Sequence, residues 1–333
     1  MEGTTEGNVP ELISRTPSFG VSVVIPAYNY ARYLGDAVGS ALAQSWSPLE
    51  VIVVDDGSKD ETPALLARIH DSRLRVIRQE NAGLSAARNT GVREARYELI
   101  AFLDADDRWA ADFLSTIAGE FGKLPDDFAI VASGWQRMTH DGQLVEQPRR
   151  IVPPASVLTA REFILRNRVF PSAVVARKSA FARCGDFDTT LRSSEDRDMW
   201  IRITTHFRAA YIDKPLVHIR RHGENMSKHA VRMRENTSRT LGKAWQCSAV
   251  SRLNLLFWAR TRSVFEYSSA WTHFSAGRRG AAFFYLACSF LMCPFFLRPS
   301  LFAERPLFRL RALRHFLCSK AASPELTPIA VAK

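Results

Sequence analysis

Four short strand-like runs alternate with segments of helical spacing, and this alternation restricts the fold more than any other feature of the chain. Residues 21–26, 50–54 and 98–103 are largely apolar, and residues 74–78 are a third strand candidate that includes two arginines. Short β-branched runs bounded by polar residues are typical of buried strands. Because strands that alternate with helices form right-handed βαβ units, the sequence predicts an α/β fold with a mainly parallel sheet flanked by helices.

Polar residues follow three of these predicted strands. The first strand leads into Tyr28 and Asn29, the second into Asp55 and Asp56, and the fourth into residues 104–107. In open α/β sheets, ligands bind outside the carboxyl ends of the strands. We therefore expect these three ends to converge on one edge of the sheet and to form a ligand site.

The fourth strand ends in three carboxylates within four residues, Asp104, Asp106 and Asp107. In an extended chain, Asp104 and Asp106 share one face. Like charges this close repel each other, and a hard divalent cation between them and a substrate phosphate would relieve the repulsion. As an alternative, Asp106 or Asp107 caps a helix over residues 110–121, because aspartate is a preferred N-cap. The triplet alone does not decide between these interpretations.

Beyond residue 121 the pattern is more mixed. Thr159 and Glu162 have the spacing of a capping box at the start of a helix. Residues 128–135 are a further strand candidate, and residues 213–215 predict a turn that leads into a strand over residues 216–220.

The positive charge of the chain is concentrated at its C-terminal end. The net charge is +11, and residues 239–333 hold 14 Lys/Arg against 3 Asp/Glu, so this segment accounts for the whole excess. It also holds 16 of the 35 aromatic residues. Basic and aromatic residues together suggest a membrane surface or a polyanion as a neighbour.

The cysteines and the N-terminal segment indicate the compartment. Five cysteines form no CxxC pair, which favours free thiols in a reducing environment. Residues 1–19 are polar and are predicted to be a disordered leader without the apolar core of a secretory signal. We therefore expect a cytoplasmic catalytic part.

Several common sites are disfavoured by missing motifs. No GxGxxG follows a predicted strand, and no GxxxxGK[ST] occurs, which argues against a dinucleotide site and a P-loop. HExxH and GxSxG are also absent.

Residues 281–297 are a 17-residue apolar run, somewhat shorter than the roughly 20 residues of a spanning helix. Residues 306–317 then predict a basic amphipathic helix. Its apolar side would carry Leu310, Leu313 and Leu317, with the arginines at 305, 309, 311 and 314 elsewhere. Three interpretations compete: an in-plane or re-entrant membrane anchor, a helical cap with solvated cations, and a nucleic-acid surface that no recognised motif supports.

Five motifs in order resemble the inverting glycosyltransferases of family 2, which have the GT-A fold. The resemblance covers residues 21–227 and is carried by VIPAYN at 24–29, VDDGSKDET at 54–62, NAGLSAARNTG at 81–91, LDADD at 103–107 and SEDRDMWIR at 194–202. It implies a catalytic domain over residues 20–230, built on a Rossmann-like, mainly parallel sheet. The resemblance does not extend to residues 231–333, which the composition predicts to be a basic, aromatic helical region with membrane association as one interpretation.

The resemblance implies a donor site. The nucleoside pocket would be walled by Pro26, Ala27 and Tyr28. Asp55 would hydrogen-bond the base, and Arg88 would approach the donor phosphates. Asp104 would also contact the donor.

The resemblance further implies a DxD metal site and a base. Asp104 and Asp106 would hold Mg²⁺ or Mn²⁺, and Asp196 would be the general base that removes the proton of the acceptor hydroxyl. His218 and the segment 221–227, which contains His222, match a loop that closes over the diphosphate, with His218 as a candidate phosphate contact. Glu195 and Arg202 are the remaining candidates from these motifs.

Each assignment has a structural alternative. Asp55 or Asp56 can shape the turn at Gly57, and Arg88 can be a solvated charge on an amphipathic helix. His218 lies in an apolar strand and can be a core histidine.

The acidic pair has an alternative as well. Glu195 and Asp196 can be first-turn acids favoured by the helix dipole. Which of the two is the base rests on the resemblance alone. Arg197 stands where members of the family often have an aromatic residue, so this position does not indicate the acceptor.

The leading hypothesis is a metal-dependent inverting glycosyltransferase. It would move a sugar from a nucleotide-sugar donor to a saccharide or lipid-linked saccharide at the inner face of the cytoplasmic membrane, in surface-polysaccharide assembly. A nucleotidyltransferase and a catalytically silent nucleotide-sugar-binding scaffold are the alternatives, and no nucleic-acid partner is expected.

Overall fold

The computed structural model describes residues 19–146, 156–167, 169–223, 229–247, 250–293 and 308–318. Apart from its last residue, the leader predicted over residues 1–19 lies outside the described residues. The same holds for the end of the apolar run, residues 294–297.

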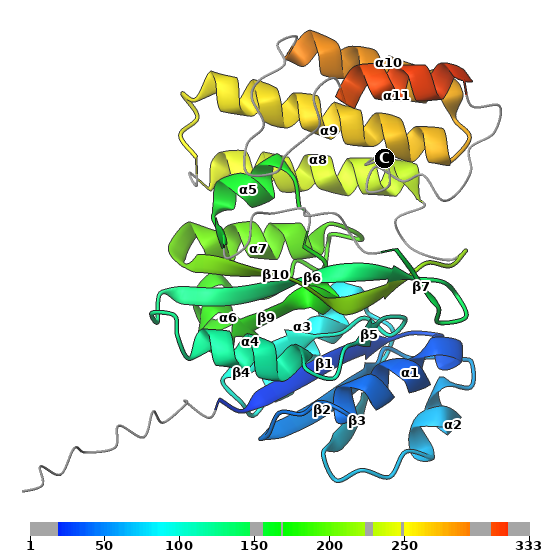
Figure 1. Cartoon of the computed structure of the whole chain (residues 1–333), viewed down its shortest axis with the longest axis vertical. Coiled ribbons are helices and arrows are strands. Elements are labelled where there is room, and N and C mark those ends of the chain that lie inside the picture. Colours follow the sequence, from blue (N-terminus) through cyan, green and yellow to red (C-terminus); the bar gives the residue numbers. More distant parts are fainter. Residues whose placement is uncertain are drawn as a thin grey trace, which may run out of the picture.

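One sheet runs through the molecule in the order β3-β2-β1-β4-β9-β6-β10-β5, with β7 paired to β6 and β8 to β10 (Figure 1). Its first four strands are β1 (Val21–Ala27), β2 (Leu49–Asp55), β3 (Leu74–Arg78) and β4 (Leu99–Phe102). These four pair in parallel. The α/β class and the four strands predicted in this region are confirmed.

The second half of the sheet is mixed. It contains β5 (Arg108–Trp109), β6 (Phe128–Met138), β7 (Leu144–Glu146), β8 (Ser156–Leu158), β9 (Val174–Arg177) and β10 (Arg208–Arg220). Strand β9 is antiparallel to both β4 and β6 and joins the two halves, whereas β6 and β10 are parallel.

Helices cover both faces of this sheet. They are α1 (Ala31–Leu42), α2 (Thr62–Ala67), α3 (Leu84–Glu94), α4 (Phe113–Phe121), α5 (Ala160–Leu165), the 3₁₀ turn η1 (Pro171–Ala173), α6 (Lys178–Cys184) and α7 (Glu195–His206). The predicted capping box of Thr159 and Glu162 is present at α5.

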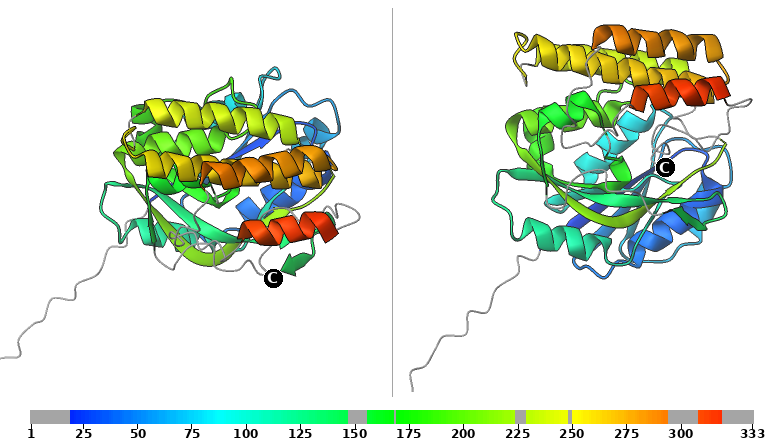
Figure 2. Two further views of the ribbon diagram at one scale, coloured as in Figure 1. Left: turned by 90° about the horizontal axis from the view of Figure 1, so that it is seen from above. Right: turned by 45° about the horizontal axis from the view of Figure 1, so that its top comes forward.

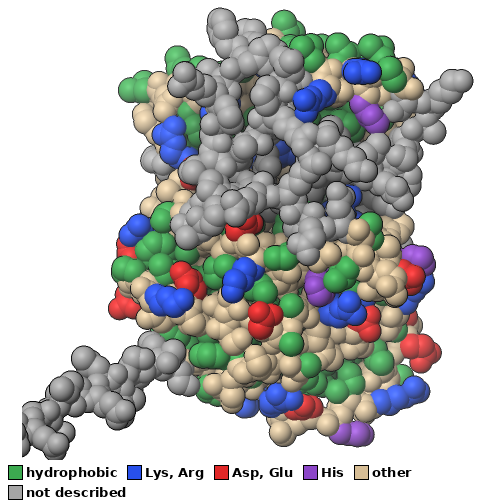
Figure 3. All heavy atoms as spheres, in the orientation of Figure 1, with side chains coloured by type: hydrophobic (Ala, Val, Ile, Leu, Met, Phe, Trp, Pro, Cys, Tyr) green, Lys and Arg blue, Asp and Glu red, His purple; other side chains and the backbone are tan. Residues whose placement is uncertain are grey.

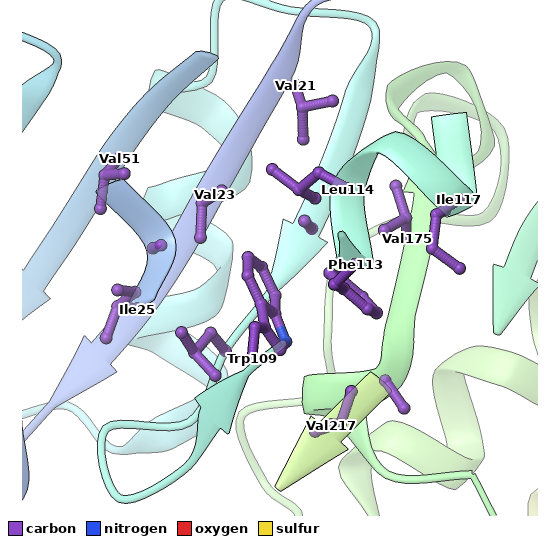
Figure 4. Close-up of a cluster of buried hydrophobic side chains, with 14 of the residues drawn as sticks. Val21, Val23, Ile25, Val51, Trp109, Phe113, Leu114, Ile117, Val175 and Val217 are labelled. Carbon is purple, nitrogen blue, oxygen red and sulfur yellow. The ribbon is translucent and has the colours of Figure 1, made fainter. Parts of the chain in front are cut away.

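The two faces of β1 pack against different helices because side chains alternate along a strand. Val23 and Ile25 belong to a buried cluster with α1 and α4, whereas Val24 belongs to the cluster on the other face with α3 and α7. Figure 4 shows the first cluster, in which Trp109 stacks on Phe113 with ring centroids 4.3 Å apart. The core therefore fixes the strand ends from both sides.

Two local predictions were wrong. Residues 213–215 do not form a turn, because β10 continues through them with register shifts against β6. Asp106 and Asp107 do not cap α4, since that helix begins only at Phe113 and residues 108–109 form β5.

The C-terminal helices form a layer of their own. They are α8 (Ala230–Gln246), α9 (Leu255–Ser275), α10 (Arg279–Met292) and α11 (Phe308–Cys318). Figures 1 and 2 show this layer lying over α5 and α7. Its small core is aromatic, and the rings of Phe274 and Phe316 stack with centroids 4.2 Å apart. Among the described residues, no helix combines the length and the apolar character needed to cross a bilayer.

The prediction of which face of α11 is buried was wrong. Leu310 and Leu317 are exposed, whereas Arg309 and Phe316 are buried and Leu313 packs at the edge of the core. The reason is local to α10, whose last carbonyl groups have no partner within the helix. Nη1 of Arg309 donates to the carbonyl oxygens of Ser289 (2.8 Å) and Cys293 (2.7 Å).

Candidate active site

The carboxyl ends of β1, β2 and β4 lie side by side, as the sequence predicts. Strand β1 pairs with β2 on one side and with β4 on the other, so the residues that follow them share one edge. Pro26 and Ala27 are buried there, and Tyr28 is 41% exposed beside them. Their predicted contact with a nucleoside stays a prediction.

Asp55 at the end of β2 has a turn-forming role. Its Oδ1 accepts a hydrogen bond from the backbone N–H of Ser58 (2.9 Å), and Gly57 between them has a φ of 77°. Its Oδ2 lies 3.7 Å from Nε of Arg78, which is largely exposed. The structural alternative for Asp55 is therefore present, and its contact with a base stays a prediction.

Asp56 supports the site in a way that the sequence reasoning did not predict. Its carboxylate accepts hydrogen bonds from Nε2 of Gln79 (2.7 Å) and from the backbone N–H groups of Ala82 (3.0 Å) and Gly83 (2.8 Å). Asp56 thereby fixes the loop that leads into α3, the helix that carries Arg88. The only signal for it was the doubled aspartate after β2.

The three acids after β4 are not in an extended chain. The N–H of Asp107 donates to the carbonyl oxygen of Asp104 (3.0 Å), which closes a turn over residues 104–107. The argument from strand alternation therefore does not hold. As a result, Asp104, Asp106 and Asp107 contact different partners and have different roles.

Asp107 has a structural role in this turn. It is buried and accepts hydrogen bonds from Oγ of Ser172 (2.5 Å) and from the N–H of Arg220 (3.0 Å). Burial, followed by the charges of Asp106 and Asp104, raises the pKa of Asp107 well above its usual value. Asp107 thus connects the acidic turn to η1 and β10.

Asp106 contacts a residue from the predicted loop over the diphosphate. Its Oδ2 lies 2.8 Å from Nε2 of His222. The imidazole packs against Tyr33, with ring centroids 5.0 Å apart. The structure therefore brings two predicted site residues, Asp106 and His222, together.

Arg88 joins the acidic turn to the acidic start of α7. Its side chain is 1% exposed, Nη2 donates to Oδ1 of Asp104 (2.7 Å), and Nη1 donates to Oε1 of Glu195 (2.6 Å). Burial alone would lower the pKa of Arg88, but Asp104 and Glu195 raise it above its usual value. The alternative of a solvated charge for Arg88 was wrong.

Asp196 lies next to this bridge, at the first turn of α7. Nδ2 of Asn167 donates to its Oδ2 (2.8 Å). Burial, followed by the negative charge of Glu195, raises the pKa of Asp196 to about 7. A carboxylate with a pKa near 7 is suited to accept a proton at neutral pH. The role of base stays a prediction.

Two other residues have structural partners. Arg197 is buried and donates to the carbonyl oxygens of Phe163 (2.9 Å) and Ile164 (2.6 Å), near the C-terminal end of α5. Arg202 binds Asp198 (3.0 Å) and the carbonyl oxygens of Cys184 and Asp186.

His218 lies in β10 opposite Arg108 of β5 and is partly buried. Burial, followed by the charge of Arg108, lowers the pKa of this histidine. Its contact with a phosphate stays a prediction.

The acidic turn fits a metal that is shared with a substrate. Within the described ranges, no group of three or more His, Cys, Asp or Glu side chains is arranged as a complete metal cage. Mg²⁺ in phosphate-binding sites keeps several waters and uses one or two carboxylates plus substrate phosphates. Asp104 and Asp106, with side chains 30% and 14% exposed, offer such a set of oxygen ligands.

Comparisons with known proteins agree with this geometry. The profile of the family described as Glycosyl transferase family 2 matches residues 22–181. An uncharacterized glycosyltransferase of Rickettsia bellii is 33% identical over 219 residues, which are 62% of this chain and 31% of that protein. The uncharacterized glycosyltransferase EpsJ of Bacillus subtilis is 35% identical over 136 residues, which are 40% of this chain and 37% of that protein. These matches place residues 22–181 of the chain in glycosyl transferase family 2.

Solved structures share the fold. Staphylococcus aureus TarS 1–349 in complex with UDP-GlcNAc matches with a TM-score of 0.56 at 17% identity, over 84% of this chain and 93% of that one. The mannosyltransferase PcManGT from Pyrobaculum calidifontis, in complex with GDP-Man and Mn²⁺, matches with a TM-score of 0.58 at 20% identity. The match covers 89% of this chain and 79% of that one. The chain spans less than two fifths of the length of either curated relative, and Asp196 lies beyond the residues that the family profile matches.

Proposed function

We propose that this protein is a metal-dependent inverting glycosyltransferase that uses a nucleotide sugar. The observation that carries the proposal is the bridge of buried Arg88 between Asp104 and Glu195, which holds the acidic turn beside Asp196. One site thus combines groups for a donor diphosphate with a carboxylate whose pKa is near 7. The acceptor would be a saccharide or a lipid-linked saccharide in surface-polysaccharide assembly.

The residues would act in a single displacement. The acceptor hydroxyl oxygen attacks the anomeric carbon from the face opposite the diphosphate, and its proton passes to the carboxylate of Asp196. The bond between the anomeric carbon and the diphosphate oxygen breaks, and its electron pair leaves with the diphosphate, so the configuration inverts. Mg²⁺ or Mn²⁺ held by Asp104 and Asp106 would offset the charge of this leaving group when bound. A positioned carboxylate base contributes a factor of about 10² to 10⁴ in rate.

The class of donor is supported by the structural neighbours. TarS has been solved with UDP and UDP-GlcNAc, and PcManGT with GDP-Man and Mn²⁺. We therefore propose a UDP- or GDP-sugar as the donor, with Pro26, Ala27, Tyr28 and Asp55 at the nucleoside. The choice of sugar depends on the shape of the pocket.

Heat stabilisation by nucleotide sugars tests this proposal. We expect one donor from a panel of UDP- and GDP-sugars to raise the melting temperature of the full-length protein in the presence of MnCl₂, because a ligand that binds only the folded state stabilises it. At a donor concentration of about 100 Kd, the gain is about 2.7 kcal/mol. A panel in which no nucleotide or nucleotide sugar shifts the melting temperature would contradict the proposal.

We also propose that the C-terminal helices contact the inner face of the cytoplasmic membrane. Large apolar side chains are exposed on this layer, among them Leu253 (90%), Leu291 (77%) and Leu317 (65%), and Arg311 and Arg314 are exposed on α11. On the face in Figure 3, apolar and basic side chains are visible at the top, and most acidic ones lie lower. Apolar and cationic side chains together favour an anionic lipid surface.

Flotation with vesicles tests this location. We expect the full-length protein to float with phosphatidylglycerol vesicles and to remain below phosphatidylcholine vesicles. Replacement of Leu253 and Leu291 by serine should weaken flotation. Protein that remains below both kinds of vesicle would rule out the membrane contact and leave the proposed reaction untouched.

A further inference from the structure

A basic cleft lies beside the candidate active site, where the C-terminal layer meets the catalytic part. Its volume is about 590 Å³. It is lined by the segment before α7, the start of α8 and the turn between α9 and α10. Because its lining residues come from both parts and α8 lies over α7 (Figure 1), the cleft lies between the two layers.

The charge of this cleft is strongly positive. Arg192, Arg232, Arg239 and Arg278 line it, and Glu235 is the one carboxylate among its lining residues. Arg239 donates to Thr190. Within the part of the chain that the structure describes, the guanidinium groups of the other three arginines form no ion pair or hydrogen bond. Cations gathered in one cleft without acidic partners repel each other, and an anionic ligand relieves this repulsion.

The start of α8 adds to the positive potential. This 17-residue helix begins at Ala230, has no side-chain hydrogen bond at its N-cap His229, and has no acidic residue in its first turn. Among the described residues, its first N–H groups therefore receive no side-chain cap, and the helix dipole favours an anion at this end. Backbone N–H groups together with arginines are the usual ligands of phosphate oxygens.

The cleft shares a wall with the segment that carries the proposed base. Arg192 stands four residues before Asp196, a stretch of at most about 14 Å. Its backbone N–H donates to Oδ1 of Asn236 in α8 (3.1 Å). A methyl group placed on Gly83 would lie 3.9 Å from Nη1 of Arg192, so this guanidinium also adjoins the loop that Asp56 fixes.

We propose that this cleft binds a phosphate or diphosphate group carried by the acceptor. This proposal rests on the proposed function, because the acceptor is defined by the proposed sugar transfer. The phosphate would hold the acceptor while its hydroxyl approaches Asp196. The phosphate group stays intact, and no bond to it is made or broken. Arg192 is the residue best placed to join the two sites, because it borders both.

Calorimetric titration of the full-length protein with inorganic pyrophosphate in EDTA tests the cleft directly. Without a divalent ion, the acidic turn and the acidic start of α7 disfavour an anion at the donor edge, so binding reports the basic cleft. We expect the double variant Arg192→Gln/Arg232→Gln to bind pyrophosphate at least tenfold more weakly. The variant Arg192→Lys/Arg232→Lys should retain most of the affinity.

A matched control removes the same charge elsewhere. Arg68→Gln/Arg183→Gln changes two exposed arginines outside the cleft, and we expect its affinity for pyrophosphate to remain within twofold of the native value. Circular dichroism of each variant verifies its fold. Equal losses in the cleft and control variants, or no pyrophosphate binding by the native protein, would overturn the proposal. The titration needs no sugar transfer. The proposal for the cleft can therefore fail while a nucleotide sugar still stabilises the protein, and the proposed function can fail while pyrophosphate still binds the cleft.

A second flotation experiment distinguishes two sources of the phosphate, a lipid headgroup and the acceptor. Flotation with phosphatidylglycerol vesicles is repeated with saturating pyrophosphate and with the variant Arg192→Gln/Arg232→Gln. If both abolish flotation, the cleft takes its phosphate from a lipid headgroup. If neither affects flotation while pyrophosphate binding is lost in the variant, the phosphate belongs to the acceptor itself.

Discussion

Replacement of Asp196 by asparagine is expected to lower the rate of sugar transfer by a factor of about 10² to 10⁴. The variant removes the proton acceptor and leaves the donor groups in place, so donor affinity should stay within about twofold. Transfer kinetics at saturating donor and donor-induced heat stabilisation measure the two quantities separately. Equal losses of transfer and donor binding would assign Asp196 a structural role.

The pH profile of the native protein is a second readout for Asp196. Because its pKa is raised to about 7, the transfer rate should fall about tenfold for each pH unit below 7, as the carboxylate becomes protonated. The folded state favours the neutral form, so the charge of Asp196 costs stability above pH 7, and this cost disappears as the pH falls from 7 toward 4. The asparagine variant should therefore melt no lower than the native protein at pH 8. A transfer rate that is flat between pH 5 and pH 8 would contradict the role of base.

Replacement of Arg88 by glutamine is expected to destabilise the protein by about 3–5 kcal/mol. Arg88 is fully buried between Asp104 and Glu195, and its removal leaves Glu195 buried without its cation. Transfer should also be lost, because Asp104 loses the group that orients it. Chemical denaturation gives the free energy of unfolding, and the transfer assay gives the rate.

The control for this variant is Arg208→Gln. Arg208 pairs with Asp127 at 3.6 Å, and both side chains are exposed, by 49% and 54%. An exposed pair contributes at most about 1 kcal/mol. If the two variants lost the same stability, the bridge by Arg88 would be an ordinary surface interaction.

The parallel half of the fold was predictable because its signals are local. Strands β1, β2 and β4 are short, largely apolar runs with polar ends, and βαβ connections restrict how they and β3 can be arranged. Their adjacent carboxyl ends follow from that arrangement, which is why Asp55 and Asp104 fall on one edge. The capping box at Thr159 is equally local and was also predicted correctly.

The contacts that organise the site have no local signal. Arg88 and Glu195 are 107 residues apart in the chain, and Asp107 and Arg220 are 113 apart. The three acids after β4 look equivalent in sequence, and only the turn closed by Asp104 and Asp107 separates their roles.

The C-terminal helices were hardest to predict because burial there does not follow hydropathy. Arg309 is buried since it binds carbonyl groups at the end of α10, and its neighbour Leu310 is exposed in consequence. A pattern that places every arginine on the solvent side therefore gives the wrong face for α11.

One comparison of melting temperatures tests the central claim, that the acidic turn after β4 holds the metal of a nucleotide-sugar site. The stabilising nucleotide sugar and MnCl₂ are added to the native protein and to the variant Asp104→Asn/Asp106→Asn. We predict that the native protein is stabilised, that EDTA cancels most of the gain, and that the double variant gains nothing from manganese. An equal, manganese-dependent gain in the double variant would place the metal elsewhere and contradict this account.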